Sequence, residues 1–198
     1  MTRLVLVRHC EPEEDMRGRC YGSLDVGLSD TGRVHARELA ARVSAGAVWT
    51  SPRLRARETA SPLSAAPLVD DDLRELDFGE LEGRTFDEIA ASEPVLYRAW
   101  METPTQVRFP GGESYADLKA RALRSLGRIS AEHESAIVVT HGGVIRAALS
   151  AWLGIPDEWI FRIDLRYGGV TIVDLVESTP IVRLVNGVEF SAARLRRP

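Results

Sequence analysis

Two histidines of the sequence stand directly after short apolar segments. His9 follows the run Leu-Val-Leu-Val and Arg8, and His141 follows Ala-Ile-Val-Val-Thr. An imidazole with an ordinary pKa of ~6.5 is largely neutral at pH 7, so its free nitrogen can attack a phosphoryl group. The two positions are therefore candidates for phosphoryl chemistry, in which an imidazole can act as the nucleophile.

Cationic residues accompany these histidines. Arg8 precedes His9, and Arg55 follows another short apolar segment at 47–50. A phosphoryl transition state spreads negative charge over its oxygens and requires positioned cations or N–H donors. Arg8 and Arg55 are candidates for such a clamp, and a helix that begins beside Gly142 would add backbone N–H groups.

A protonated carboxyl group is one donor that can protonate the oxygen that leaves phosphorus. The segment LRELDFGELEG at 73–83 carries four acidic residues close to a predicted strand end. Glu75 is a candidate for the general acid if a partly apolar, crowded site raises its pKa. Glu80 and Glu82 are expected to be solvated charges.

Other chemistries find less support in the sequence. It contains no H-E-x-x-H, no cysteine pair with zinc spacing, no G-x-x-x-x-G-K-[ST] and no G-x-S-x-G. His9, His141 and a carboxylate would suffice for a metal site, but the adjacent arginines would repel a cation, so we expect no metal. His35 and His133 are expected to be structural.

Length and composition fit one domain of 198 residues. The net charge of −4 argues against a nucleic-acid-binding protein. No apolar run reaches the ~20 residues of a membrane span, and the N-terminus does not resemble a signal peptide, so we expect a cytoplasmic protein with reduced Cys10 and Cys20. Every basic residue except Lys119 is an arginine, so an anion site here would be built from guanidinium groups.

Periodicity and turn residues predict alternating strands and helices. Strands are expected at 3–7, 47–50, 136–140, 163–165, 170–176 and 181–185, and helices at 29–43, 52–60, 85–92, 114–134 and 144–153. This alternation is typical of an α/β protein, a three-layer α/β/α sandwich around a mostly parallel sheet. Ligands bind at the carboxyl ends of the strands in such sheets. The basic tail at 191–198 is expected to be frayed.

Six segments, in order, resemble the histidine phosphatase superfamily, also called phosphoglycerate mutase-like. They are RHCE at 8–11, GRCYGSLDVGLSDTG at 18–32, SPRLRARETA at 51–60, LRELDFGELEG at 73–83, PGGES at 110–114 and VVTHGG at 138–143. Each motif is weak alone, but the ordered series covers nearly the whole chain. The resemblance implies the same α/β/α sandwich for a single domain over 1–198.

The resemblance also implies a role for each candidate residue. His9 would be the nucleophile that becomes phosphohistidine. Arg8, Arg55 and His141 would hold the phosphoryl oxygens. Glu75 would protonate the leaving oxygen and then activate water. The family pattern implies no metal and no organic cofactor.

The chain departs from the family pattern beside the nucleophile. Cys10 stands where the family usually has glycine, Pro12 where it has threonine, and Asp15 where it has a phosphate-contacting asparagine, while Arg53 replaces leucine. A side chain at position 10 would crowd the phosphate if the backbone were left-handed there. One hypothesis is that Arg8 lowers the pKa of the Cys10 thiol and makes it oxidisable; the alternative is a small buried thiol.

Within the superfamily, the compact chain favours hydrolysis of a small phosphomonoester. The runs RCYG and PGGES resemble α-ribazole phosphatases, which dephosphorylate the lower-ligand nucleoside of cobalamin. Two alternatives stay open: a phosphoglycerate mutase, and a catalytically degenerate member that binds phosphorylated ligands. We expect a monomer or a homodimer. Expected substrate-side residues are Glu11, Tyr21, Ser23, Arg84 and Gly142.

Overall fold

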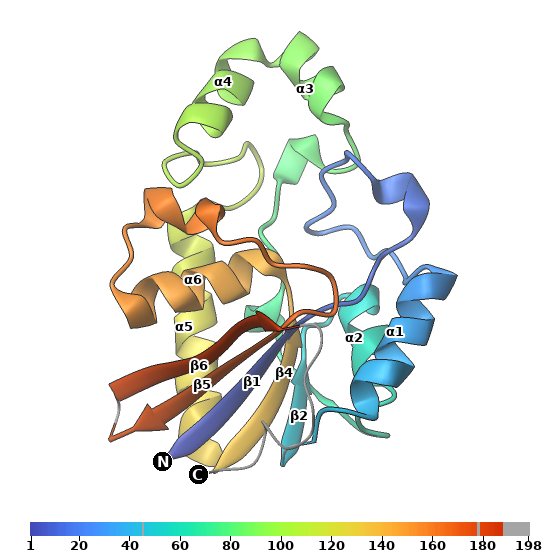
Figure 1. Ribbon diagram of the computed structural model, residues 1–198. Helices are drawn as coiled ribbons and strands as arrows, with labels where there is room; N and C mark the ends of the chain where they lie inside the picture. The colour runs from blue at the N-terminus through green and yellow to red at the C-terminus, as the bar shows by residue number, and fades with distance from the viewer. Residues whose placement is uncertain (45, 178, 188–198) are drawn as a thin grey trace.

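The computed structural model describes residues 1–44, 46–177 and 179–187. Sixteen helices and strands follow one another along these residues (Figure 1). In chain order they are β1 (Thr2–Arg8), η1 (Glu14–Met16), α1 (Asp30–Ala40), β2 (Ala47–Thr50), α2 (Leu54–Ala60), β3 (Leu68–Val69), η2 (Asp71–Leu73), η3 (Gly79–Leu81), α3 (Phe86–Ser92), α4 (Pro94–Glu102), α5 (Tyr115–Glu132), β4 (Ser135–Thr140), α6 (Gly142–Leu153), η4 (Asp157–Arg162), β5 (Val170–Val176) and β6 (Thr179–Gly187), where η denotes a 3-10 helix.

The strands form a single six-stranded sheet in the order β3-β2-β4-β1-β5-β6. Strand β1 pairs in parallel with β4, β4 with β2, and β2 with β3. Strand β5 is antiparallel to both of its neighbours, β1 and β6. The sheet is therefore mixed but mostly parallel, as the alternation of elements predicted.

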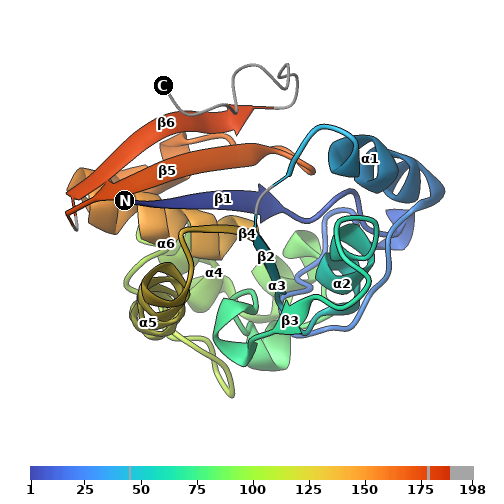
Figure 2. The ribbon, with the colours of Figure 1, turned by 90° about the horizontal axis from the view of Figure 1, so that it is seen from below.

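Alternating side chains of β1 build a core on each face of the sheet. Leu4 and Leu6 pack in the cluster of α5 and α6, whereas Val5 and Val7 pack in the cluster of α1 and α2. Figure 2 shows these two helix pairs on opposite sides of the strands. The predicted three-layer α/β/α sandwich is thus confirmed.

Helices α3 and α4 form a cap, residues 86–102, beyond the carboxyl ends of the strands (Figure 1). Thr85 begins α3 with a capping box that it forms with Glu88, and Pro94 begins α4. Trp100 of α4 packs against Phe78 and Phe109, at ring-centroid distances of 5.5 and 5.1 Å. Aromatic contacts therefore attach the cap to the loops above the sheet.

The structure differs from the sequence predictions at several elements. Helix α4 and the short edge strand β3 were not predicted, and α1 ends at Ala40 instead of position 43. The strand predicted at 163–165 is wrong, because the carbonyl oxygens of Ile163 and Leu165 accept hydrogen bonds from the side chains of Arg146 and Arg8 instead of a neighbouring strand. The tail at 191–198 lies outside the described residues. The helices that the structure describes are too short or too polar to cross a membrane.

Candidate active site

The carboxyl ends of three adjacent strands bring the predicted imidazoles together. His9 follows β1, Ser51 follows β2 and His141 follows β4. The backbone N–H of His9 donates to the carbonyl oxygen of Thr140 at 2.8 Å, which ties β1 to β4 at this edge. The ring centroids of His9 and His141 are 5.1 Å apart. The two histidines, 132 positions apart in the sequence, thus share one site.

His9 is held in one orientation and one tautomer. Its Nδ1 lies 2.7 Å from the carbonyl oxygen of Cys10, and a carbonyl oxygen can only accept, so Nδ1 carries the proton. Burial, together with the cations of Arg55 and Arg8, lowers the pKa of His9 well below its ordinary value. His9 is therefore neutral at pH 7, with the lone pair on Nε2.

His141 is buried beside His9. Its Nε2 lies 2.7 Å from the hydroxyl oxygen of Ser51, and burial and the cation of Arg55 lower its pKa well below the ordinary value. Among the described residues, nothing accepts a hydrogen bond from its buried Nδ1. When Ser51 donates to Nε2, Nδ1 carries the ring proton and becomes a further donor for an anion.

Arg55 is wholly buried and held by the loop that contains Tyr21. Its Nη1 donates to the carbonyl oxygen of Leu24 at 2.8 Å, and its Nη2 donates to that of Gly22 at 2.9 Å. Its Nε is buried and has no partner in the described parts of the chain. The Nε–H group of Arg55 therefore remains able to donate a hydrogen bond to a ligand.

Arg8 stands on the other side of His9. Its Nη1 donates to the carbonyl oxygen of Leu165, and its guanidinium carbon lies 4.1 Å from the ring centroid of Tyr167. Its Nε, like that of Arg55, is buried and unpaired among the described residues. Together with His141, the two arginines supply unpaired N–H donors around the neutral imidazole of His9, which is the chemistry of an oxyanion site.

Glu75 reaches this site from the loop after η2. Its Oε1 accepts the backbone N–H of Leu76 at 2.9 Å, and its Oε2 accepts that of Gly143, in the first turn of α6, at 3.1 Å. A Cβ on Gly143 would lie 2.2 Å from Oε1, so only glycine admits this approach. The N–H of Gly143, which we expected to face a phosphate, serves Glu75 instead.

The backbone of Glu75 is fixed by a buried arginine that the sequence did not reveal. Arg121 of α5 donates to the carbonyl oxygens of Asp72, Arg74 and Glu75 at 2.9, 2.6 and 3.0 Å. Its ion pair with Glu113, 2.7 Å between Nη2 and Oε2, compensates its charge. Arg121 therefore positions the acidic loop over α6.

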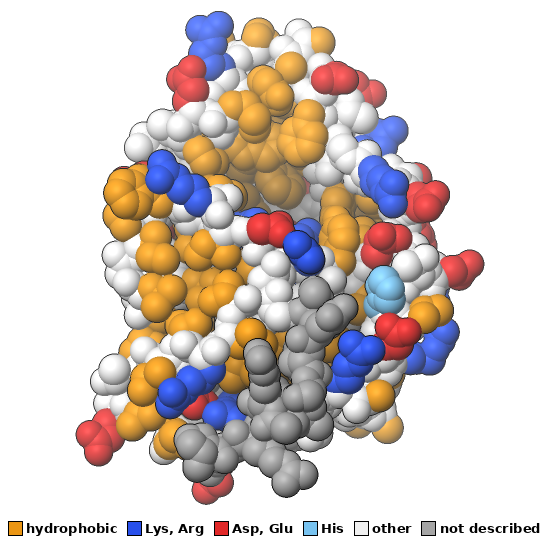
Figure 3. Space-filling model, in the orientation of Figure 1, with side chains coloured by type: hydrophobic (Ala, Val, Ile, Leu, Met, Phe, Trp, Pro, Cys, Tyr) orange, Lys and Arg blue, Asp and Glu red, His pale blue; other side chains and the backbone are white. Residues whose placement is uncertain are grey.

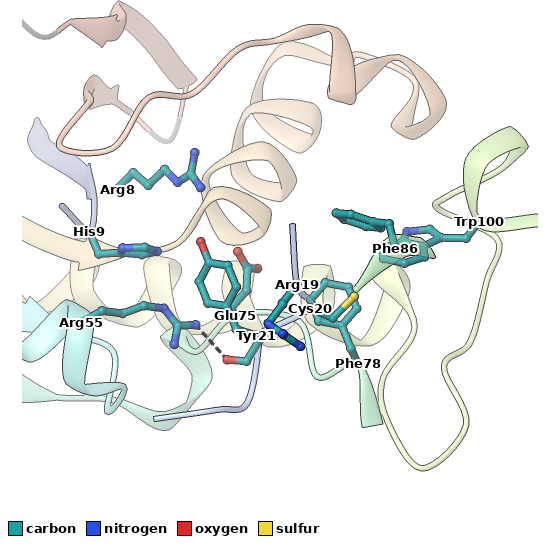
Figure 4. Close-up of a pocket in the computed structure, with 11 residues that line it drawn as sticks. Arg8, His9, Arg19, Cys20, Tyr21, Arg55, Glu75, Phe78, Phe86 and Trp100 are labelled. Atoms are coloured by element: carbon teal, nitrogen blue, oxygen red, sulfur yellow. Dashed lines mark hydrogen bonds between the residues drawn. The ribbon is translucent and has the colours of Figure 1, made fainter. Parts of the chain in front are cut away.

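Arg8, His9, Arg55 and Glu75 line a cavity of about 150 Å³, which we call the phosphate pocket; His141 and Arg121 are not among its lining residues. Figure 4 shows Arg8, His9 and Arg55 at one end, with Tyr21 and Glu75 in the middle. The opposite end is aromatic. The lining residues there are Phe78, Phe86 and Trp100, and Arg19, Cys20 and Gly22 complete the wall.

Of the predicted substrate-side residues, Tyr21 lines the cavity, and Gly142 lies beside one of its lining residues, Arg8. The hydroxyl of Tyr21 is 2.7 Å from that of Tyr167, a residue that sequence reasoning missed. A Cβ on Gly142 would be 3.7 Å from Nε of Arg8. Tyr167 is 146 residues from Tyr21 in the sequence, and no local sequence pattern predicts a contact over that separation.

Glu11, Ser23 and Arg84 do not line the phosphate pocket either. The carboxylate of Glu11 accepts from the hydroxyl of Ser29 at 2.9 Å, and Arg84 donates to the hydroxyl of Ser92. The backbone N–H of Ser23 donates to Glu82 at 2.8 Å. Glu82 is also within 3.0 Å of the N–H of Phe78, so our expectation of a solvated charge is wrong for Glu82, because it fastens two loops.

The departures from the family pattern are accommodated. Among the described residues, the non-glycine residues with positive φ are Glu177 and Asn186, so Cys10 carries its side chain without strain. The thiol packs with Leu28 and Ala36, away from the pocket lining, and burial raises its pKa to about 11. The hypothesis of a low thiol pKa is therefore wrong. Asp15 is exposed in η1 and does not line the pocket.

Metal ligands do not gather in the part of the chain that the structure describes. There, no group of three or more histidine, cysteine, aspartate and glutamate side chains could hold an ion.

The chain is similar in sequence to two curated relatives. The chain is 36% identical over 196 residues to a "bifunctional protein" of Mycobacterium tuberculosis, which covers 93% of this chain and 54% of the relative. It thus spans about half the length of that protein. It is 35% identical over 159 residues to the "metal-independent phosphoserine phosphatase" of Arabidopsis thaliana, with 74% of this chain and 67% of the relative covered.

Solved structures show the same fold. The protein YhfR of Bacillus stearothermophilus matches with a TM-score of 0.88 and 30% identity, over 97% of this chain and 99% of that one. The α-ribazole phosphatase of Shigella flexneri matches with a TM-score of 0.84 and 25% identity, over 94% of this chain and 97% of that one. The family model described as histidine phosphatase superfamily, branch 1, matches residues 4–187. The chain belongs to the histidine phosphatase superfamily.

Proposed function

We propose that this protein is a phosphomonoesterase that works through a phosphohistidine on His9. The observation that carries the proposal is a neutral imidazole, fixed by its Nδ1 hydrogen bond at 2.7 Å, among unpaired N–H groups of Arg8, Arg55 and His141. Such a site binds the three oxygens of a phosphoryl group and presents a nucleophile to its phosphorus. The relative named as a phosphoserine phosphatase supports the same reaction class.

In the first step, Nε2 of His9 forms a bond to phosphorus while the bond from phosphorus to the ester oxygen breaks. The electron pair of that bond goes to the leaving oxygen, which takes a proton from Glu75. Arg8, Arg55 and His141 stabilise the charge on the phosphoryl oxygens. The product is an alcohol, and the phosphoryl group stays on His9.

In the second step, water replaces the nitrogen. Glu75, now a carboxylate, takes a proton from the water as its oxygen bonds to phosphorus. The bond from phosphorus to Nε2 breaks, and its electron pair returns to the imidazole. Inorganic phosphate leaves, and both His9 and Glu75 recover their initial protonation.

The test compares His9→Ala with His35→Ala, because His35 is exposed on α1. With ethyl phosphate as substrate, we expect His9→Ala to lose at least about 10³-fold in kcat, as nucleophile removal does elsewhere, and His35→Ala to stay near wild type. Acid-labile label from a ³²P-ester should appear on the wild type and not on His9→Ala. Full activity of His9→Ala, or the absence of labelled protein, would contradict the proposal.

A more specific proposal concerns the alcohol part of the substrate. We propose α-ribazole phosphate as one candidate substrate, supported by the likeness to the Shigella flexneri enzyme and by the RCYG and PGGES runs. Comparing kcat/KM for α-ribazole phosphate and phosphoserine tests it, since a preference for phosphoserine would remove the candidate. With 3-phosphoglycerate, release of free phosphate supports the hydrolase, whereas interconversion to the 2-isomer would favour a mutase.

A further inference from the structure

A second cavity lies next to the phosphate pocket. It also has a volume of about 150 Å³ and lies between α4 of the cap, α5, α6 and η4. We call it the apolar chamber. Figure 3 shows hydrophobic side chains gathered around a hollow below the cap. The chamber is lined by Leu76, Phe78, Trp100, Pro104, Tyr115, Leu118 and Phe161, with Glu75, Gly143 and Arg146 as the other lining residues.

The two cavities meet at the proposed proton donor. Glu75, Phe78 and Trp100 line both the phosphate pocket and the apolar chamber. Because Glu75 must touch the leaving oxygen, that oxygen lies where the cavities join. The carbon attached to it then continues away from phosphorus, and the apolar chamber is a space into which the rest of the alcohol can extend.

The walls of the chamber suit a ring better than a charged group. Tyr115 and Phe161 stand with ring centroids 6.2 Å apart, and Phe78 and Trp100 with centroids 5.5 Å apart. A cavity of about 150 Å³ lined by apolar side chains holds one benzene molecule. The size and lining of the chamber therefore match one six-membered apolar ring.

The cation in the chamber already has partners within the protein. The guanidinium of Arg146 donates to the carbonyl oxygen of Ile163 at 3.2 Å and lies 5.5 Å from the ring of Phe161. The carboxylates of Glu75 and Asp164 act on its charge. Its Nε, like those of Arg8 and Arg55, is buried and has no partner among the described residues. Arg146 is therefore partly paired within the protein and keeps one donor for a polar atom of the ligand, while most of the chamber wall is apolar.

We propose that the apolar chamber binds the alcohol part of the substrate, and that the preferred substrates are monophosphates of primary alcohols that carry an apolar ring of benzene size. This proposal rests on the proposed phosphatase function and adds the substrate class. A small alcohol with a carboxylate, as in phosphoserine, is the competing occupant, because its carboxylate would face Arg146.

The experiment uses esters whose alcohols have similar leaving abilities, so that only binding differs. For the wild type, we expect kcat/KM for 2-phenylethyl phosphate to exceed that for ethyl phosphate by about 10- to 100-fold, which is the worth of burying one aromatic side group. Phosphoserine should resemble ethyl phosphate. Equal values for the two alkyl esters, or a preference for phosphoserine, would overturn the proposal.

A matched pair of variants in η4 locates the effect. Phe161 lines the chamber and is 47% exposed, whereas Trp159 is 51% exposed and lines neither cavity. We expect Phe161→Ala to lower kcat/KM for 2-phenylethyl phosphate by about 5-fold or more and to leave ethyl phosphate within about twofold. Trp159→Ala should change neither ester. A loss with ethyl phosphate as large as with the phenyl ester would place Phe161 outside the alcohol site.

A binding measurement separates the failure of this proposal from the failure of the phosphatase proposal. Phosphonates have no ester bond to hydrolyse, so calorimetry of 2-phenylethylphosphonate and ethylphosphonate reports recognition without turnover. Tighter binding of the phenyl compound supports the chamber even if no ester is hydrolysed. Equal binding overturns the chamber even if His9 forms phosphohistidine.

Discussion

The phosphate pocket and the apolar chamber share Glu75 but are built from different parts of the fold. The pocket lies at the carboxyl ends of β1, β2 and β4, and its side chains Arg55 and His9 are buried. The chamber is assembled by α4, η4 and α5, and its Phe161 is 47% exposed. If the proposed function holds, the reacting phosphoryl group is bound at buried strand ends, whereas the alcohol is recognised by surface elements, which tolerate sequence change.

The largest loss of activity should follow a substitution in the phosphate pocket. Arg55→Ala removes a buried cation of the phosphate pocket and leaves the carbonyl oxygens of Gly22 and Leu24 without their donor. We expect about a 10³-fold loss in kcat/KM with every ester, because transition-state charge loses its partner. Steady-state kinetics with ethyl and 2-phenylethyl phosphate measure it.

Arg57→Ala is the matched control, since Arg57 is exposed on the same helix. Arg55→Lys keeps the charge but not the fork, so it should fold and recover only part of the activity. A loss confined to one ester would show that Arg55 recognises the alcohol and would erase the distinction between the two regions.

The junction of the two regions is tested by Gly143→Ala. The new Cβ would lie 2.2 Å from Oε1 of Glu75 and must displace that carboxyl group. We expect kcat/KM for ethyl phosphate to fall by about 10²-fold, the usual worth of a general acid, and kcat/KM for 4-nitrophenyl phosphate to fall less, because nitrophenolate leaves without a proton and kcat/KM does not include the later attack of water. Gly127→Ala is the control, since nothing lies within 4 Å of its Cβ. Equal losses for both esters would remove Glu75 as the proton donor.

The two buried histidines should make the stability of the folded protein sensitive to acid. Burial lowers the pKa of His9 and His141 in the folded protein, so below the unfolded value of ~6.5 the unfolded chain binds protons that the folded protein refuses. The contribution of the two histidines to the stability of the folded protein is therefore highest above about pH 6.5. It decreases as the pH falls towards the lower pKa values that the two histidines have in the folded state. The free energy of unfolding should decrease with a slope of up to about 1.4 kcal/mol per pH unit for each histidine.

Urea unfolding between pH 7.5 and 5 measures this slope. His9→Gln should flatten it, while His35→Gln should not, because His35 is exposed. A wild-type stability that rises between pH 6.5 and 5 would contradict the expected sign.

The smallest effect should come from the loops that close the phosphate pocket. Tyr167→Phe removes the 2.7 Å hydrogen bond to the hydroxyl of Tyr21 but keeps an aromatic ring beside Arg8. We expect kcat/KM to fall less than about 5-fold, in line with one neutral hydrogen bond. Tyr97→Phe in the cap is the control, and kinetics with ethyl phosphate are the measurement. A loss as large as that of Arg55→Ala would make Tyr167 part of the clamp.

Much of the candidate site at the strand ends could be predicted from the sequence. Short apolar runs that end in Arg8-His9 and in His141 predicted parallel strands whose carboxyl ends meet, because such ends share one edge of a sheet. The structure brings these residues together with Arg55 and Glu75. The cap was predicted only in part, because the helix at 85–92 was expected but α4 was not. Leu96 and Trp100 of α4 pack in the core of the cap whereas Val95 is 84% exposed, so no single apolar face marks this helix in the sequence.

The layered α/β architecture and the imidazole and guanidinium groups of the site could be read from local features, because strand periodicity and residue type are local properties. The remaining features of the site arise from tertiary packing. This packing lowered the pKa values of His9 and His141, turned Cys10 away from the pocket, assigned the N–H of Gly143 to Glu75, and opened a chamber next to that carboxylate. Burial, electrostatic interaction and cavity shape depend on residues that are distant in the chain, so no local pattern contains them.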